Sequence, residues 1–195
     1  MTQEVLLNAS NENITHAASL IRDGKLVAFP TETVYGLGAD ATSDAAIAGI
    51  YEAKGRPSFN PLIIHFPDMN TAMNAVDFND QATLLAKTFW PGALTIVLKK
   101  KDDCPISQLA SAGLETLAVR VTSHPLAQTL IKESGKPVAA PSANRSGQVS
   151  PTAAEHVFEG LGERIDAILN GGACSVGLES TVIDLSGDTP TLLRP

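Results

Sequence analysis

Two cations, an amide and a histidine lie close together in the stretch AKGRPSFNPLIIHF, as Lys54, Arg56, Asn60 and His65. Lys54 and Arg56 are two positions apart, and side chains with that spacing on an extended chain point to the same side. The apolar run around His65 predicts a buried strand. Converging cations at the entry to a buried strand favour a pocket for an anionic ligand.

Each of these residues also has a simpler explanation when it is taken alone. The proline after Arg56 disfavours helical dihedrals, so a preceding helix should end near Lys54 or Gly55. A lysine in the last turn of a helix is favoured by the helix dipole without any ligand. A single histidine in a strand is more often a hydrogen-bonded core residue than a ligand-binding one. The alternation places His65 on one strand face with Ile63, opposite Ile64.

A second polar segment is FPTETVYGLGADA, in which Thr31, Thr33 and Tyr35 should share one side of an extended chain. Its glycines permit a tight turn or a close approach of a ligand to the backbone. GLGADA formally matches the GxGxxA dinucleotide fingerprint. However, the preceding apolar strand ends too early, and no acidic residue follows about twenty positions later. A dinucleotide site is therefore not expected.

The stretch AAPSANRSGQVSPT is rich in small residues and hydroxyls, and it contains Ser142, Asn144 and Ser150. Ser150 is a candidate N-cap, with Pro151 at the first helical position. Backbone amides at such a helix start could bind a phosphate. An ordinary capped loop explains the same composition equally well.

Two later strands carry further polar residues. In TLAVRV, Thr116, Ala118 and Arg120 face one side of a predicted strand. An arginine buried without a partner is very unfavourable, so Arg120 either faces solvent or binds a carboxylate with its planar fork. Ser180 begins the strand of LESTVIDL, and Arg194 follows the strand of LLRP. Taken alone, both look like ordinary polar residues at strand ends.

The elements that must position these residues alternate along the chain. Helices are expected at 13–22, from 43 or 44 to 53, at 81–89, at 125–133 and from 150 onward. Strands are expected at 26–29, 62–66, 94–98, 117–121, 138–140, 181–185 and 191–193. Several of these strands are separated by turns rather than helices. The pattern predicts one α/β domain over residues 1–195, with no second domain, built on a twisted, mostly mixed open sheet flanked by helices.

Composition narrows the classes of function. The 195 residues are 44% hydrophobic and 18% charged, with a formal net charge of −7. That charge argues against a generally basic nucleic-acid-binding surface, although it permits a local basic pocket. Cys104 and Cys174 form no CxxC motif, and no apolar run reaches membrane-spanning length, so a cytoplasmic location is expected. GxSxG, HExxH and Walker A patterns are missing, which favours charge stabilisation by positioning over covalent catalysis.

Taken together, these segments resemble the threonylcarbamoyl-AMP synthase family, also called YrdC or TsaC. PTETVYGLG, AKGRPSFNPLIIH, LAVRV, APSANRSG, SPT and LESTVIDL with LLRP occur in the family's order, from about Phe29 to Arg194. NPLIIH, SPT and LLRP resemble the catalytic domain of the family's longer form, which has an extra C-terminal domain. The resemblance implies a YrdC-like α/β fold with a deep, positively charged cavity on one side of the sheet.

The resemblance also implies an activity. L-threonine, bicarbonate and ATP would give threonylcarbamoyl-AMP and pyrophosphate, which is a nucleotidyltransferase reaction. The product would supply the threonylcarbamoyladenosine modification of tRNA through a separate transferase system, with direct tRNA contact possible. Mg²⁺ would come with ATP, and neither an organic cofactor, a metal held by protein side chains alone nor a membrane is implied. The alternatives are an RNA-binding protein in tRNA or ribosome maturation, which would use the same basic cavity, and a nucleotide-sensing domain.

The family pattern implies a role for each matching residue. The catalytic set would be Lys54, Arg56, Ser142 and Asn144. ATP would contact Arg56, Asn60, Thr116, Ser142, Ser150 and Arg194. L-threonine would contact Thr33, His65, Arg120, the Ala140 backbone and Ser180.

Overall fold

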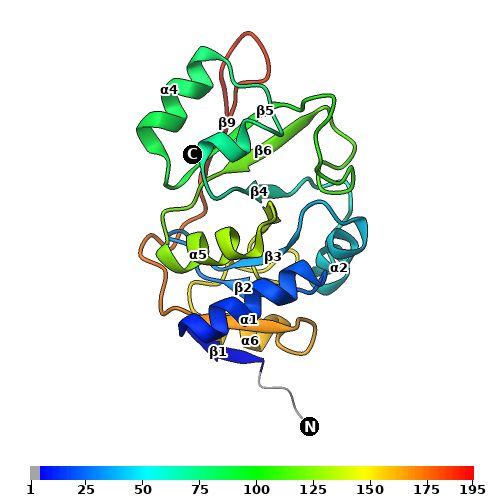
Figure 1. Ribbon diagram of the computed structural model, residues 1–195, viewed down its shortest axis with the longest axis vertical. Helices are drawn as coiled ribbons and strands as arrows, with labels where there is room; N and C mark the ends of the chain where they lie inside the picture. The colour runs from blue at the N-terminus through cyan, green and yellow to red at the C-terminus, as the bar shows by residue number, and fades with distance from the viewer. Residues whose placement is uncertain (1–4) are drawn as a thin grey trace.

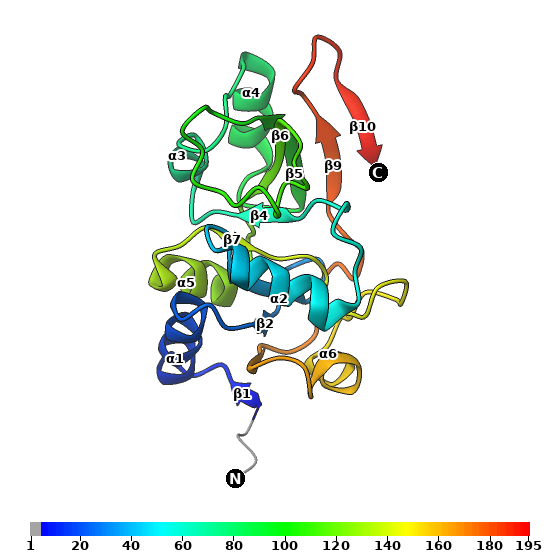
Figure 2. The same cartoon turned by 90° about the vertical axis from the view of Figure 1, so that its right-hand side faces the viewer.

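A computed structural model describes residues 5–195, in which ten strands form one sheet with helices packed against both of its faces (Figures 1 and 2). The strands are β1 (Leu6–Asn8), β2 (Val27–Phe29), β3 (Gly36–Asp40), β4 (Ile63–His65), β5 (Leu94–Lys99), β6 (Thr116–Arg120), β7 (Val138–Ala139), β8 (Ala167–Asn170), β9 (Thr181–Asp184) and β10 (Thr191–Arg194). The helices are α1 (Asn11–Arg22), α2 (Asp44–Lys54), α3 (Met69–Ala72), α4 (Asp80–Phe89), α5 (Pro125–Ser134) and α6 (Ala154–Leu161).

The sheet is mixed, as the sequence predicts. Its spatial order is β1-β8-β2-β3-β7-β4-β6-β5-β9-β10. The pairs β1/β8, β2/β8, β4/β6 and β5/β9 are parallel, and the remaining neighbours are antiparallel. This order brings β4 and β6 together in the middle of the sheet and joins the C-terminal hairpin β9–β10 to β5. Candidate residues far apart in the chain therefore lie on adjacent strands.

Side chains alternate between two apolar layers. On β2, Val27 and Phe29 pack with α1 and α5 on one face, whereas Ala28 joins the larger core on the other face, which includes residues of α2, α4 and α6. Figure 2 shows α1 and α5 side by side, and the two helices make many mutual contacts. Burying both sheet faces explains why β2 is continuously apolar, since a strand covered on both sides needs no polar face.

The end of α2 positions the first pair of candidate cations. Ser43 is the N-cap and accepts a hydrogen bond from the Ala46 amide at 3.3 Å. Gly55 ends the helix in the left-handed conformation at φ 58°, which glycine adopts without a steric penalty. Both ends agree with the sequence expectation. Lys54 is therefore the last helical residue, and Arg56 starts the extended loop that leads to β4.

One predicted helix boundary is wrong. The helix expected to begin at Ser150 begins at Ala154, with Ala153 as an N-cap that makes no side-chain capping bond. Tertiary contacts hold the preceding residues in an extended path: Ser150 Oγ donates to Glu179 Oε1 at 2.7 Å, and the Tyr35 amide donates to the Pro151 carbonyl at 2.8 Å. Ser150 thus does not cap a helix, so neither alternative that places a helix start at Ser150, the phosphate-binding one or the ordinary capped loop, is correct.

Sequence analysis also missed β1, β3, β8 and the short helix α3. The glycines of GLGAD, which permit a tight turn or a close approach of a ligand, lie instead in β3, whose five residues are all buried. A Cβ on Gly38 would come within 2.5 Å of the Phe29 ring, so close packing of β3 against β2 explains this glycine. Within residues 5–195, none of the helices has the length and apolar character needed to cross a membrane. The single-domain interpretation of residues 1–195 stays a prediction, and residues 1–4 lie outside the described part.

Candidate active site

A cavity of about 270 Å³ lies against one face of β4 and β6. Its other walls come from the loops after β2 and β7, from the loop that carries Arg56, and from β9 and β10. The structure brings eight of the sequence-predicted site residues to this cavity. They are Thr33, Arg56, His65, Arg120, Ala140, Ser142, Ser180 and Arg194.

The other five predicted residues do not line the cavity. Lys54 is buried behind it, where Nζ donates at 2.5 Å to the carbonyls of Ser142 and of Asn144. The Asn144 amide is used within its own loop, because it donates to the carbonyls of Arg145 and Gln148. Lys54 therefore braces the Ser142 loop from behind and does not project into the cavity.

Asn60, Thr116 and Ser150 lie at the margins of the cavity. The Asn60 carbonyl accepts from the Tyr51 hydroxyl at 3.0 Å, which places its backbone against α2. Thr116 starts β6 two residues before Ala118, a cavity residue on the same strand face. Ser150 contacts the cavity through Glu179, to which its hydroxyl donates.

The first wall is a turn after β2 that is not extended as predicted. The Thr31 hydroxyl donates to the Val34 carbonyl at 2.7 Å and lies 2.8 Å from the Thr33 hydroxyl. This side chain–backbone turn rotates the chain, so Thr31 and Thr33 face the cavity while Tyr35 points into the core. The Tyr35 hydroxyl donates to the Gly172 carbonyl at 2.7 Å, and burial raises its pKa to about 12.

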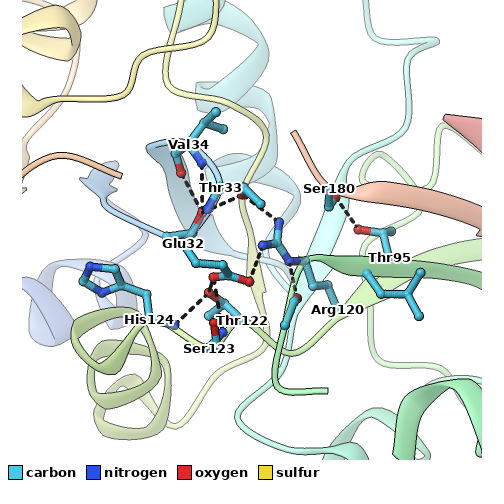
Figure 3. Close-up of polar contacts among 12 residues, drawn as sticks. Glu32, Thr33, Val34, Thr95, Arg120, Thr122, Ser123, His124 and Ser180 are labelled. Atoms are coloured by element: carbon cyan, nitrogen blue, oxygen red, sulfur yellow. Dashed lines mark hydrogen bonds and ion pairs between the residues drawn. The ribbon is translucent and has the colours of Figure 1, made fainter. Parts of the chain in front are cut away.

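Arg120 on β6 is almost completely buried and is held by three partners (Figure 3). Its Nε donates to the Gly92 carbonyl at 3.1 Å, Nη1 to the Thr33 hydroxyl at 3.1 Å, and Nη2 to Glu32 Oε1 at 2.6 Å. Glu32 is not among the site residues that were predicted from the sequence. The available signal was the acidic residue in PTET together with the requirement that a buried arginine have a partner.

His65 on β4 projects into the same cavity. It packs edge-to-face against Phe29, and neither ring nitrogen has a hydrogen-bond partner among the described residues. Complete burial, followed by the nearby Arg120 charge, lowers the pKa of His65 to about 3. The ring is therefore neutral at physiological pH and is suited to exchange hydrogen bonds with a ligand. The predicted alternation holds, since Ile63 and His65 line the cavity while Ile64 joins the core.

Another wall contains a second ion pair, between Arg194 of β10 and Glu179 before β9. Arg194 Nε also donates to the Ser180 carbonyl at 2.8 Å, and the Ser180 hydroxyl lies 2.8 Å from that of Thr95. Burial alone would raise the pKa of Glu179, but the Ser150 hydrogen bond and the Arg194 charge bring it below its usual value. Glu179 is the second acidic residue that sequence analysis missed.

Arg56 differs from the other two cavity arginines. It donates to the Pro61 carbonyl at 3.2 Å, and within residues 5–195 it has no carboxylate partner. Burial, followed by the neighbouring Arg56 charge, lowers the pKa of Lys54 to about 8. Three guanidinium groups and one neutral imidazole thus surround a space that suits an anionic ligand.

Comparisons with known proteins agree with this fold. A family model described as telomere recombination (Sua5/YciO/YrdC) matches residues 19–195. Threonylcarbamoyl-AMP synthase of Bacillus subtilis is 52% identical over 97% of this chain and 55% of that protein. The structure of P. abyssi Sua5 complexed with L-threonine matches with a TM-score of 0.95 at 48% identity, covering 98% of this chain and 57% of the other. E. coli YciO matches with a TM-score of 0.86 at 27% identity, covering 100% and 95%. The chain spans about half the length of the first curated relatives.

Proposed function

The chain belongs to the Sua5/YciO/YrdC family, and on this premise we propose that it makes threonylcarbamoyl-AMP from L-threonine, bicarbonate and ATP. Pyrophosphate would be the leaving group, which makes the reaction a nucleotidyl transfer. The observation that carries the proposal is the convergence of Arg56, Arg120 and Arg194 on one cavity. The same cavity contains Thr33 and His65, whose ring nitrogens have no hydrogen-bond partner within residues 5–195. The P. abyssi relative, similar over nearly the whole chain, was solved with L-threonine.

The chemistry explains why cations must converge. The amine of L-threonine takes up carbon dioxide derived from bicarbonate, which gives an N-carboxylate. An oxygen of that carboxylate attacks the α-phosphorus of ATP, and the bond from this phosphorus to the bridging oxygen of pyrophosphate breaks. Both reactants are anions, so Coulomb repulsion opposes their approach in a pocket of low dielectric constant. Fixed guanidinium groups offset this repulsion and align the reacting atoms.

The two walls suggest a division of the ligands. L-threonine would bind on the wall of Thr33, His65 and Arg120, where the neutral imidazole can hydrogen-bond its polar groups. The nucleotide would bind towards Arg56, Ser142 and Arg194, with Ser150, Asn60 and Thr116 at the margin. Lys54 and Asn144 would act through the loop they brace, which positions Ser142.

Magnesium is treated as part of the MgATP substrate. Among the described residues, no group of three or more His, Cys, Asp or Glu side chains could hold a metal ion. The carboxylate of Glu179, which is the one that lines the cavity in the described part of the chain, already binds Arg194 and Ser150. This donor set fits a metal that arrives bound to phosphates, where it would neutralise charge on the triphosphate.

Downstream, the threonylcarbamoyl group would be transferred to tRNA by a separate system. Threonylcarbamoyl-AMP is an activated mixed anhydride, so a transferase that accepts it must follow. The test of the proposal is pyrophosphate release by the purified chain with ATP, Mg²⁺, bicarbonate and L-threonine, without RNA. We expect release only when all four are present. Release that requires RNA would favour an RNA-dependent role, and ATP binding without release would favour a nucleotide sensor.

A further inference from the structure

We propose that Glu32 is a positioning residue for amino-acid binding, because it holds the Arg120 guanidinium so that its remaining N–H groups face the cavity. This inference rests on the proposed function for the identity of the ligand, L-threonine. Glu32 does not line the cavity, and its carboxylate acts through Arg120 (Figure 3).

Arg120 has more N–H donors than its three partners use. A guanidinium has five N–H donors in a fixed planar fork. Three of them are used, by the Gly92 carbonyl, the Thr33 hydroxyl and Glu32 Oε1. These partners lie on two segments, the turn that carries Glu32 and Thr33 and the Gly92 loop before β5, so together they fix both the position and the rotation of the plane. One N–H on each terminal nitrogen remains for a ligand, and two such groups match the two oxygens of a carboxylate.

Glu32 is itself anchored on its far side. Oε2 accepts hydrogen bonds from the Thr122 hydroxyl and from the Ser123 amide, the latter at 3.2 Å. Burial alone would raise the pKa of Glu32, but the Arg120 charge and the Thr122 hydrogen bond lower it below its usual value. The carboxylate therefore stays ionised and fixed. An incoming ligand carboxylate would have to break three hydrogen bonds to displace it, so the ligand instead takes the free N–H groups.

The position of Glu32 in the chain links the Glu32–Arg120 pair to other residues of the wall where L-threonine is proposed to bind. The residue lies between Thr31 and Thr33, whose hydroxyls face the cavity and bond to each other. Thr33 accepts from Arg120, so the Glu32–Arg120 pair also orients the Thr33 hydroxyl. Loss of the pair would disturb two ligand-binding groups on this wall, while Arg56 and Arg194 on the nucleotide side would keep their partners.

The test is the isosteric variant Glu32→Gln, studied by calorimetric titration with L-threonine and, separately, with MgATP. We expect the dissociation constant for L-threonine to rise about tenfold or more, while that for MgATP changes less than about threefold. In the pyrophosphate assay, the KM for L-threonine should rise and the KM for ATP should stay near wild type. Glu32→Asp keeps the charge on a shorter side chain and should recover part of the L-threonine affinity.

Asp40→Asn is the matched control. Asp40 is a buried acid on β3 that pairs with Lys136 at 3.0 Å and accepts from Thr42, away from the cavity. This variant also removes the charge of a buried carboxylate that is held in an ion pair, so it should lower stability without changing the affinity for L-threonine. A purely structural role for Glu32 would make the two variants behave alike.

If Glu32→Gln does not fold, Thr122→Val decides the question, because it leaves both charges and removes the hydroxyl that holds Oε2. An L-threonine dissociation constant about threefold weaker would support the inference. A wild-type constant in folded Glu32→Gln, or in Thr122→Val when the first variant does not fold, would overturn it. A wild-type chain that binds L-threonine yet releases no pyrophosphate would remove the proposed reaction and leave this inference standing.

Discussion

The two ion pairs beside the cavity differ in burial. The side chains of Arg120 and Glu32 are 4% and 11% exposed, whereas those of Arg194 and Glu179 are 36% and 32% exposed. The first pair joins the turn after β2 to β6, which lies in the middle of the sheet. The second belongs to the C-terminal hairpin at the edge of the sheet, as Figure 2 shows for β9 and β10.

Because the two ion pairs differ in burial, we expect them to have different roles in the site. A buried pair cannot exchange partners without leaving a charge in a medium of low dielectric constant, so it acts as a fixed part of the site. The Arg194–Glu179 pair, with 36% and 32% of its side chains exposed, can be solvated when it opens, so Arg194 would be able to exchange Glu179 for the phosphate of the proposed nucleotide. We therefore interpret the Arg120 wall as rigid and the Arg194 wall as adaptable.

Removing each arginine in turn should give the largest difference between the two ion pairs. Arg120→Ala leaves the Glu32 carboxylate buried and unpaired, and should lower the free energy of unfolding by about 3–5 kcal/mol. Arg194→Ala leaves Glu179 accessible to water and should cost less than about 1 kcal/mol. Urea denaturation of both variants measures the difference. Equal losses would show that the two walls are not distinct in this way.

Arg56 differs from both paired arginines because it has no acidic partner in the described part of the chain. Arg56→Ala leaves no unpaired carboxylate, so the fold should survive while pyrophosphate release falls about a hundredfold or more, roughly 3 kcal/mol of transition-state stabilisation. Lys54→Ala should lose activity comparably, because the Ser142 loop loses its brace. Circular dichroism supplies the folding control. Folded variants with normal rates would show that the site is assigned wrongly.

Protonation of the His65 imidazole should make the stability of the protein depend on pH. Its pKa is about 3 in the folded protein, compared with an ordinary value of 6.5. Between these values the unfolded chain binds more protons, so this contribution is fully present above pH 6.5 and is lost as pH falls towards 3. At pH 5 the loss should be about 2 kcal/mol, and His65→Asn should be spared it. Thermal unfolding at pH 7 and pH 5 tests this, and parallel losses in both proteins would contradict it.

The smallest expected effect is the change of an ion-pair coupling energy with salt concentration. A double-mutant cycle on Arg194 and Glu179 should give a coupling energy of about 0.2–1 kcal/mol that decreases in concentrated NaCl. The same cycle on Arg120 and Glu32 should give a larger coupling that changes little with salt. A salt-insensitive Arg194–Glu179 coupling would mean that this pair is as fixed as the buried one.

Local sequence patterns predicted several of the elements that position the site residues. Strand alternation placed His65 and Arg120 on cavity-facing positions, and capping chemistry located both ends of α2. These features depend on near neighbours in the chain, so a single sequence contains the information. The mixed character of the sheet also followed, because turns rather than helices separate several strands.

The features that the sequence did not predict depend on contacts between residues that are far apart in the chain or on local side-chain hydrogen bonds. Glu32 and Arg120 are 88 positions apart, and no local periodicity indicates that they meet. The Ser150 helix start failed because bonds to Glu179 and Tyr35 outweigh a good local capping signal. Tyr35 turned into the core because the Thr31 hydroxyl forms a local turn that alternation does not anticipate.

The central claim is that this cavity joins L-threonine, bicarbonate and ATP. The most direct measurement is mass spectrometry of the reaction mixture after incubation with ¹³C-labelled bicarbonate, L-threonine, ATP and Mg²⁺. The account predicts threonylcarbamoyl-AMP that carries the label, and its disappearance when Arg56→Ala replaces the wild-type chain. An active preparation that converts ATP to AMP without a labelled adenylate, or that forms the adenylate equally well with Arg56→Ala, would contradict it.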